Sequence, residues 1–562
     1  MEAPREWPPL AWACAMEGRP ISSATSPLFS IPSEILQLIA TYVAQDKRHL
    51  ALLALVNSTC RQLARAFQFR SVVLDYGSIS LSMLHLLQKE ARHRVPSSDR
   101  ITVSPSMGTC IRELSVNADN YWPYMRTIAP LSHEGTGRAL TGIEIERARH
   151  LVALLNGHIA CLYWPAVYLV IPTLSNLRSL TITGVTVDNE LVRCLVGLPV
   201  KHLTLNGQCI GPLTTSLFAM GVCPQLETIN VEVAWQFEFA YYSPGPFDAS
   251  PFFQALFNSC AATLRDISME QRVIPTQNAK YKPIHLDSLV FPKLKFLRIP
   301  GHDTALTASA WSSIVRQGLT FLDIPYGEPS MVHSLSECGR INTLQTLLLH
   351  GGFPHAPDET TSFRFIELNN QIETLVMFHS YKDSFIVHVL RSIRRHNKLR
   401  KLYIHWLENS IPEEGLAALS QLSQLEVLRL GAGESAGYPH NWFVDHRKII
   451  AHLCCLTRLR RLIIMRDTYQ LADNDAMETG ADRYYDFRRP GTWLWSEHEA
   501  RMLEIAIAYV NILPNLEFLH VGQVLFTVHE QQGARNPVVS GSAWVGQKEY
   551  NANMKEFGVN IN

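Results

Sequence analysis

The sequence has no excess of charge of either sign and few cysteines for its length. Lys plus Arg (50) balances Asp plus Glu (50) over 562 residues, so no global field draws the chain toward nucleic acid or an anionic membrane. The eleven cysteines form no C-x-x-C pair and no zinc-finger spacing, which predicts no metal site, and we also expect no cofactor. Adjacent Cys454 and Cys455 are expected to be buried small apolar side chains.

Signals for secretion or membrane passage are also missing. The first sixteen residues carry Glu2, Arg5 and Glu6 and no sustained apolar run, unlike a signal peptide. The apolar segment Leu151–Leu174 contains Asn, Gly and two prolines, which leave pieces shorter than the roughly 20 residues that a bilayer needs. This segment predicts a buried helix followed by a buried strand, and the chain is expected to be cytoplasmic, nuclear or both.

No catalytic motif is present. Phosphate loops, H-E-x-x-H, G-x-S-x-G and dinucleotide fingerprints are all missing from the sequence, so we expect a protein that binds and does not catalyse. A start resembling a calcium loop at Asp473-Asn474-Asp475 fails, because its sixth position is Glu478 and its twelfth is Tyr484.

A short pattern dominates the chain from Ser175 onward: apolar, two variable, apolar, one variable, apolar. Most copies start 23 to 30 residues after the previous one, close to the leucine-rich-repeat period. The twelve copies are Leu177-Leu180-Ile182, Val200-Leu203-Leu205, Leu226-Ile229-Val231, Leu264-Ile267-Met269, Leu294-Leu297-Ile299, Leu319-Leu322-Ile324, Leu344-Leu347-Leu349, Ile372-Leu375-Met377, Leu399-Leu402-Ile404, Leu425-Leu428-Leu430, Leu459-Leu462-Ile464 and Leu516-Leu519-Val521.

Each copy predicts a strand followed by a returning helix, as at Asp383–Arg395 and Pro412–Leu422. One such unit cannot bury its leucines, whereas stacked units share a core and line a parallel sheet. The chain resembles the leucine-rich-repeat family up to Val521, from about Ser175 or from an irregular copy at Ile111-Leu114-Val116. This resemblance implies an α/β solenoid with parallel strands on the concave face and helices on the convex face. The Asn or Cys that regular members carry at the ninth position is missing.

A different pattern precedes the repeats. Pro32, Ser33 and Glu34 mark a helix start, and apolar residues at helical spacing predict three short helices within about forty residues. So short a module cannot bury that much apolar surface alone, which implies a partner.

The segment Leu28–Leu74 resembles an F-box. Ile31-Pro32, Glu34-Ile35-Leu36, Ile39, Leu52, Leu55-Val56-Asn57 and Arg61-Gln62-Leu63-Ala64 match the F-box pattern in order, and Phe69–Leu74 resembles the strand by which fungal members enter their repeats. The resemblance implies a Skp-type adaptor and, through it, a cullin ubiquitin ligase. The residues it assigns to adaptor binding are Ile31, Pro32, Ile35, Leu36, Ile39, Leu52, Leu55 and Val56.

Two alternatives stay open: the helices only cap the repeats, or the chain is a repeat scaffold without a ligase role. The predicted organisation is a flexible tail over residues 1–27, an F-box over 28–74, repeats over 75–529 with an insertion at about 466–500, and a C-terminal tail over 530–562. The aromatic insertion either closes over the concave face or packs on a neighbouring repeat.

The concave face is where a protein substrate is expected to bind. In each copy the third, fifth and seventh residues point away from the core. Early copies place polar and acidic residues there, namely Thr181, His202, Asn206, Glu232, Asp266 and Glu270. Later copies are aromatic and basic, which favours a binding hot spot, although an ordinary solvated surface is an alternative. The predicted substrate-binding residues are Phe378, Lys401, Tyr403, His405, Arg429, Arg461, Phe518 and His520.

Overall fold

The computed structural model describes most of the repeat region and the helices before it. The described residues are 31–75, 77–94, 106–117, 161–210, 222–234, 249–272, 283–286, 289–300, 306–315, 318–325, 329–350, 359–378, 383–408, 410–432, 444–464, 493–522, 524–531 and 534–542. The predicted tail over 1–27 and most of the predicted insertion at 466–500 lie outside these ranges.

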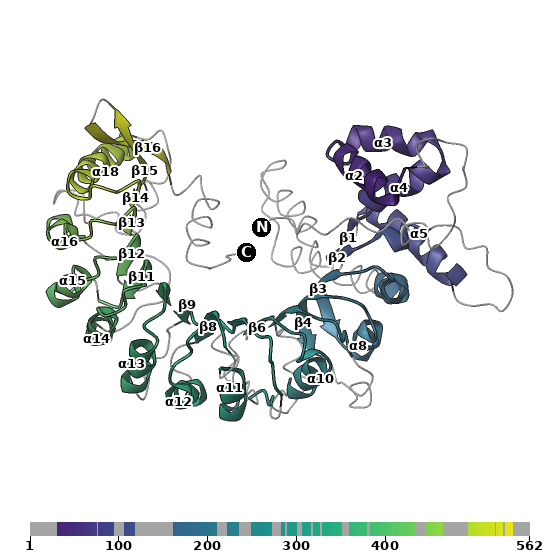
Figure 1. Ribbon diagram of the computed structural model, residues 1–562, viewed down its shortest axis with the longest axis horizontal. Helices are drawn as coiled ribbons and strands as arrows, with labels where there is room; N and C mark the ends of the chain where they lie inside the picture. The colour runs from purple at the N-terminus through teal and green to yellow at the C-terminus, as the bar shows by residue number, and fades with distance from the viewer. Residues whose placement is uncertain are drawn as a thin grey trace, which may run out of the picture. The chain divides into compact units, whose positions relative to one another are not determined.

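The chain divides into two compact units, and each is considered by itself. Unit 1 comprises residues 1–284 and 289–293, and unit 2 comprises residues 285–288 and 294–562. In each unit, strands form an open sheet and the helices between them lie on one of its faces (Figure 1). The predicted α/β class and the strand–helix repeat are therefore confirmed.

Unit 1 begins with three helices, α2 (Ser33–Val43), α3 (Lys47–Val56) and α4 (Ser58–Gln68), as the sequence predicts. Six parallel strands follow in chain order, with α5 (Ser78–Arg94), η2 (Gly108–Cys110), η4 (Ile171–Thr173), α8 (Asn189–Leu195) and α10 (Ser250–Cys260) between them. The strands are β1 (Ser71–Leu74), β2 (Glu113–Asn117), β3 (Ser179–Val187), β4 (His202–Ile210), β5 (Thr228–Ala234) and β6 (Asp266–Arg272). The helix over residues 161–170 ends in η4 and not in a strand, which corrects the prediction for Leu151–Leu174.

Unit 2 continues the same repeat with parallel strands from β7 to β14. These strands are β7 (Phe296–Arg298), β8 (Phe321–Pro325), β9 (Thr346–His350), β10 (Thr374–Phe378), β11 (Lys401–Trp406), β12 (Val427–Ala432), β13 (Arg461–Ile464) and β14 (Phe518–Val521). The helices on one face of this sheet are α11 (Ala308–Val315), α12 (Pro329–Cys338), α13 (Glu359–Leu368), α14 (Asp383–Ile393), α15 (Glu413–Leu419), α16 (His446–Leu453) and α18 (Trp493–Ile512).

A backbone contact recurs where each repeat enters its strand. The carbonyl of the residue before one strand accepts hydrogen bonds from two successive amides at the start of the next strand. For example, the Arg400 carbonyl accepts from Glu426 N–H at 2.8 Å and Val427 N–H at 3.0 Å. Equivalent pairs occur at Arg178 in unit 1 and at Glu373 in unit 2. Successive repeats are thus joined by main-chain atoms, and no Asn side chain at the ninth position is needed.

The core of each unit lies between the sheet and its helices. The three apolar residues of every predicted copy are buried, as with Leu402 and Ile404 of β11, which are fully enclosed. Intervening helices supply the other side, including Phe385 and Leu390 of α14. Period-2 alternation in the strands therefore assigns the residues between the core positions to the opposite face.

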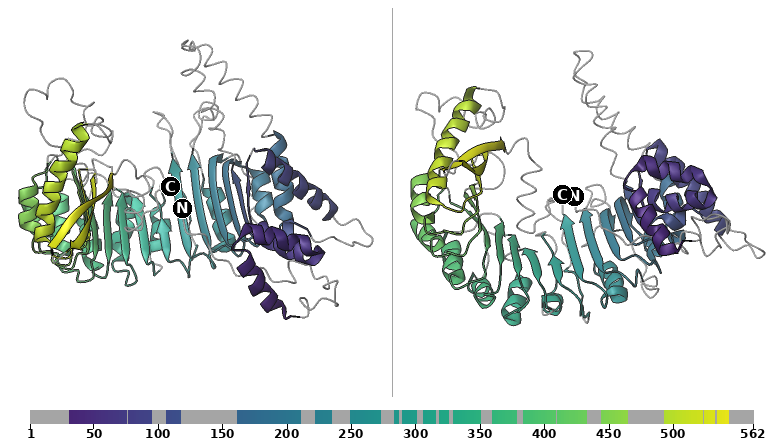
Figure 2. Two further views of the ribbon diagram at one scale, coloured as in Figure 1. Left: turned by 90° about the horizontal axis from the view of Figure 1, so that it is seen from above. Right: turned by 45° about the horizontal axis from the view of Figure 1, so that its top comes forward.

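The end of unit 2 differs from the prediction of a tail from residue 530. Strand β15 (Val524–Gln531) pairs antiparallel with β14, and β16 (Ala534–Ser542) pairs antiparallel with β15. Both strands contact α18 (Figure 2). The predicted boundary therefore falls inside β15. Antiparallel strands that cover a sheet edge leave fewer backbone groups open to unwanted pairing.

The adjacent cysteines do not lie in the core. Cys454 and Cys455, predicted to be buried, are both exposed at the end of α16, with their sulfur atoms 3.9 Å apart.

Within the described ranges, none of the helices is long and apolar enough to cross a bilayer.

Candidate binding surfaces

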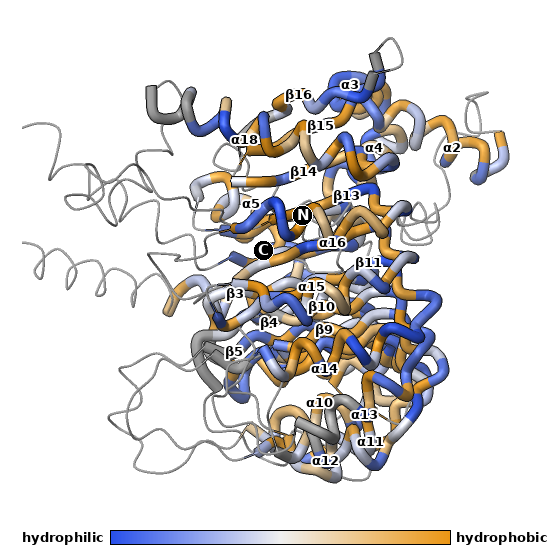
Figure 3. Tube along the Cα trace, turned by 90° about the vertical axis from the view of Figure 1, so that its left-hand side faces the viewer, coloured by the Kyte–Doolittle hydropathy of each residue, from blue (hydrophilic) through white to orange (hydrophobic). Residues whose placement is uncertain are grey.

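Helices α2 and α3 carry an exposed apolar surface in unit 1. Seven of the nineteen exposed large apolar side chains of the described chain lie on these two short helices. Figure 3 shows the apolar residues along α2. The seven, which we call the α2–α3 apolar surface, are Ile35, Leu38, Ile39, Tyr42, Leu52, Leu55 and Val56, and they are 42% to 76% exposed.

Local capping fixes the geometry that leaves this surface exposed. Pro32 precedes α2, the Asp46 carboxylate accepts from Arg48 N–H at 2.8 Å at the start of α3, and the Asn57 side chain accepts from Cys60 N–H at 2.7 Å at the start of α4. The Asp46 and Asn57 side chains each satisfy an amide that the helix itself cannot. The turns between the helices are therefore short and defined.

The three helices share a small interior of their own. Ala40 of α2 and Leu63 of α4 pack with Leu53 and Phe67. Leu36 is also buried, with 2% of its surface exposed, which corrects its assignment to the partner-facing set. The other predicted adaptor-binding residues are exposed, except Ile31, which is half-buried.

Helix α4 anchors the module to the repeats of unit 1. The Gln62 side-chain amide donates to the Ser106 carbonyl at 3.3 Å, and Ala66 packs on Cys110 of η2 together with Phe67 and Phe69. One side of the module therefore closes the start of the sheet while α2 and α3 leave their apolar residues in solvent.

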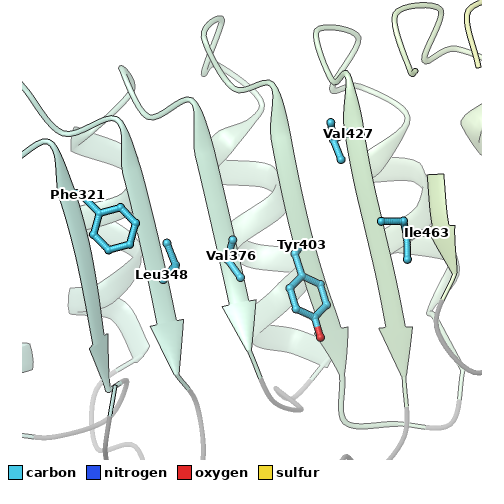
Figure 4. Close-up of a cluster of buried hydrophobic side chains, with 6 residues drawn as sticks. All are labelled: Phe321, Leu348, Val376, Tyr403, Val427 and Ile463. Atoms are coloured by element: carbon cyan, nitrogen blue, oxygen red, sulfur yellow. The ribbon is translucent and has the colours of Figure 1, made fainter. Parts of the chain in front are cut away.

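A second candidate surface is the face of β7–β14 opposite the helices, which we call the unit 2 concave face. Six side chains along it form a continuous buried apolar row (Figure 4): Phe321, Leu348, Val376, Tyr403, Val427 and Ile463. Phe296 and Phe518 extend the row at its two ends, and the rings of Phe296 and Phe321 stack with centroids 3.9 Å apart.

The predicted substrate-binding residues are brought together on this face, but not all of them are accessible. Tyr403, His405 and Arg429 are buried, whereas Lys401, Arg461, Phe518 and His520 are half-buried. The backbone of Phe378 ends β10, and its side chain lies outside the described part of the chain.

Two arginines on the unit 2 concave face lie over aromatic rings. The Arg429 guanidinium lies 4.5 Å from the centre of the Tyr403 ring, and that of Arg461 lies 5.6 Å from the centre of Phe518. Burial, and after it the charge of Arg429, lower the pKa of His520 to about 3. The absence of a side chain at Gly431 leaves room for the His405 ring, because a Cβ at Gly431 would lie 2.7 Å from Nδ1 of that ring.

A buried charge cluster at β7–β9 was not among the predicted site residues. The Asp323 carboxylate has no exposed surface, and it lies 3.1 Å from Arg298 Nε and 2.6 Å from His350 Nε2. These residues occupy the same outward strand positions that the sequence rule gives. Applying the rule to the copies at Leu294, Leu319 and Leu344 would have found them.

Within the described residues no group of three or more His, Cys, Asp or Glu side chains is placed to hold a metal ion. No protein-family model matches the chain, and no curated protein sequence matches it.

Proposed function

We propose that the chain is the substrate-recognition subunit of a Skp-cullin-F-box type ubiquitin ligase, in which the helical module docks the adaptor and the repeats bind a protein substrate. The observation that carries the proposal is the α2–α3 apolar surface. Fully burying a Leu or Ile side chain contributes roughly 1.5 to 3 kcal/mol, so a surface of seven exposed apolar residues, five of them Leu or Ile, favours a partner. The chain would supply proximity between substrate and ligase, and the transfer chemistry would belong to other subunits.

The exposed position of this surface supports a docking role beyond capping. If the module were only a cap, its apolar residues would be expected to pack on the repeats, as Ala66 and Phe67 of α4 do. Ile35, Leu52 and Leu55 are exposed instead. Capping by α4 and docking by α2 and α3 are compatible, because they use different sides of the module.

A scaffold role without a ligase is the second candidate. A leucine-rich-repeat scaffold would use the same sheet surface and would bind no cullin. A scaffold that binds the adaptor would use the α2–α3 apolar surface as well, so this surface does not separate the two candidates. Recovery of the cullin separates the two.

The first experiment is co-purification of a Skp-type adaptor and its cullin with the full chain. We expect Ile35→Lys combined with Leu55→Asp to abolish recovery of both partners, because two charges would then have to be buried at the interface without counter-charges. The matched control is Ile79→Lys combined with Leu86→Asp, which makes the same changes at two exposed apolar residues of α5.

Circular dichroism must show that both variants keep the helix and strand content of the native chain. Recovery of adaptor and cullin with the native and control chains, together with loss of both with the α2–α3 variant, supports the ligase role. If the native chain recovers the adaptor and no cullin, the scaffold role replaces the ligase role. If neither partner is recovered, the module is only a cap.

A further inference from the structure

We propose that the adjacent thiols of Cys454 and Cys455 form a two-thiolate site for one thiophilic divalent cation of the Zn²⁺ type. The inference goes beyond the proposed function, because it depends on neither the adaptor nor the substrate. The cysteine spacings of the sequence contain no zinc motif. The site follows instead from where the structure places the two sulfur atoms.

The pair is accessible, unlike most thiols of the chain. Of the nine cysteines that the structure describes, Cys454, Cys455 and Cys161 are exposed, and five others are buried. Burial raises the pKa of the Cys194 thiol to about 12 and that of the Cys260 thiol to about 12, so these thiols keep their protons and do not meet ions in solution. Cys454 and Cys455 thus present two neighbouring thiols to solvent.

The distance between the two sulfur atoms fits one shared ion. Cys454 Sγ and Cys455 Sγ lie 3.9 Å apart, directly after the last residue of α16. Two thiolates that bind one tetrahedral ion at the usual Zn–S distance of about 2.3 Å are separated by about 3.8 Å. The pair can therefore bind such an ion with little movement of either side chain.

A disulfide between the same two residues is less favourable. The Cα atoms of most disulfides are about 4.4 to 6.8 Å apart, whereas those of neighbouring residues are only about 3.8 Å apart across a trans peptide bond. Direct joining of the thiols would distort the backbone at the end of α16. A bridging ion leaves that backbone unchanged, so the geometry favours ion binding over oxidation.

The end of α16 also favours a cation. The Cys454 thiol donates to the Ala451 carbonyl oxygen at 3.1 Å, and the carbonyl groups at a helix C-terminus carry partial negative charge that attracts cations. The hydrogen bond between the two thiols raises the pKa of the Cys455 thiol. A bound ion would displace these protons, as metal ions do when thiolates bind them.

Two protein ligands leave the ion with open positions. Among the residues that the structure describes, no third His, Cys, Asp or Glu joins the pair in a metal-binding group. Nε2 of His452 lies 2.7 Å from Glu413 Oε1 and is engaged there. Structural zinc sites usually have four protein ligands and catalytic sites three, so we expect weaker, reversible binding with water in the remaining positions.

The test is titration of the full chain with Cd²⁺ in metal-free buffer that contains a phosphine reductant. Cd²⁺ is the probe because its bonds to thiolates produce a charge-transfer absorption band in the ultraviolet, which reports sulfur ligation directly. We expect Cys454→Ser combined with Cys455→Ser to remove this band and to weaken Cd²⁺ binding at least about tenfold. Excess Zn²⁺ should compete with Cd²⁺ and reduce the band of the native chain.

Single variants distinguish one shared ion from two independent thiols. If both sulfur atoms hold the same ion, Cys454→Ser alone and Cys455→Ser alone should each lose nearly as much affinity as the double variant. The matched control is Cys161→Ser combined with Cys338→Ser, which removes one exposed and one half-buried thiol at separate places. The control should keep the band and the affinity, and circular dichroism should show that every variant is folded.

Four results would overturn the inference. The first three are a band that survives in the double variant, equal losses in the double variant and the control, and single variants that each lose only half of the band. The fourth is a native chain that shows no Cd²⁺ band but forms a Cys454–Cys455 disulfide, detected by mass spectrometry, when oxidised glutathione replaces the reductant. That result would make the pair a redox site instead of an ion site.

Discussion

The sheet faces opposite the helices differ between the two units, although the same strand pattern builds both. In strands β2–β6 of unit 1 the central positions are Ser115, Thr181, Thr204, Asn230 and Ser268, all small, polar and half-buried. In unit 2 the corresponding positions include Asp323, Leu348, Val376, Tyr403 and Arg429, which are all buried. The same strand pattern thus presents a polar, half-buried surface in unit 1 and a buried surface in unit 2.

Charge separates the two faces as well. Strands β2–β6 contain the carboxylates Glu113, Glu232, Asp266 and Glu270 and one arginine, Arg272, the reverse of the balance in β7–β14. The difference teaches that the core positions set the fold, while the alternate positions accept different residues in the two units. A substitution on the unit 2 face should therefore cost more than its counterpart on the unit 1 face.

The largest difference is expected at Asp323. Asp323→Asn removes the negative charge that lies 3.1 Å from Arg298 Nε and 2.6 Å from His350 Nε2, and breaking a buried ion pair typically costs about 3 kcal/mol or more. The counterpart Glu232→Gln, half-buried in unit 1 and 3.2 Å from the Asn206 amide, should cost less than about 1 kcal/mol. Hydrogen exchange of peptides covering β7–β9 and β4–β6, with chemical denaturation, measures both. Equal losses of unfolding free energy in the two variants would contradict the expected difference between the two faces.

A smaller effect is expected from reciprocal exchanges in the central row. Val376→Thr buries a hydroxyl among Leu348 and Tyr403 and should destabilise unit 2 by about 1 to 3 kcal/mol. Thr204→Val on the half-hydrated face should change stability by less than about 0.5 kcal/mol. Denaturation midpoints of the two variants provide the measurement, and a costly Thr204→Val would show that the unit 1 face is also tightly packed.

An effect that appears only at acid pH is expected in unit 2. The pKa of His520 is lowered to about 3 in the folded chain, against roughly 6.5 in an unfolded chain. Between these values the unfolded chain binds more protons, so stability falls as pH decreases from about 6.5 toward 3. His520→Gln should flatten this slope in hydrogen exchange of β13 and β14 measured from pH 7.5 to 4.5. An unchanged slope would show that protonation of His520 does not change the free energy of unfolding.

Much of the fold could be predicted because the signal is repeated. The middle residue of every apolar triplet from Leu177 to Val521 lies on a strand, and Asp383 begins a helix as expected. The pair β15 and β16 was missed because it pairs antiparallel and lies outside that pattern, with Pro537 within β16. Exposure of Cys454 and Cys455 was missed because residue type alone does not fix which side of a helix end faces solvent.

The candidate surfaces were predicted less completely. Outward positions such as Lys401 and Arg461 follow from strand alternation, since side chains on one face recur every second residue. Burial of Tyr403 and Arg429 could not be predicted, because alternation gives the direction of a side chain and not what covers it. Leu36 was misassigned because a resemblance to an F-box pattern does not separate the interior of the helical module from its surface.

The paired amides that enter each strand have a consequence for how such a chain can change. Since one carbonyl, such as that of Arg400, accepts from two main-chain amides of the next repeat, this part of the joint between repeats does not depend on side-chain identity. Whole repeats could in principle be duplicated, deleted or exchanged between related chains while the joint is preserved. The binding surface would then diversify by recombination of repeats as well as by point substitution.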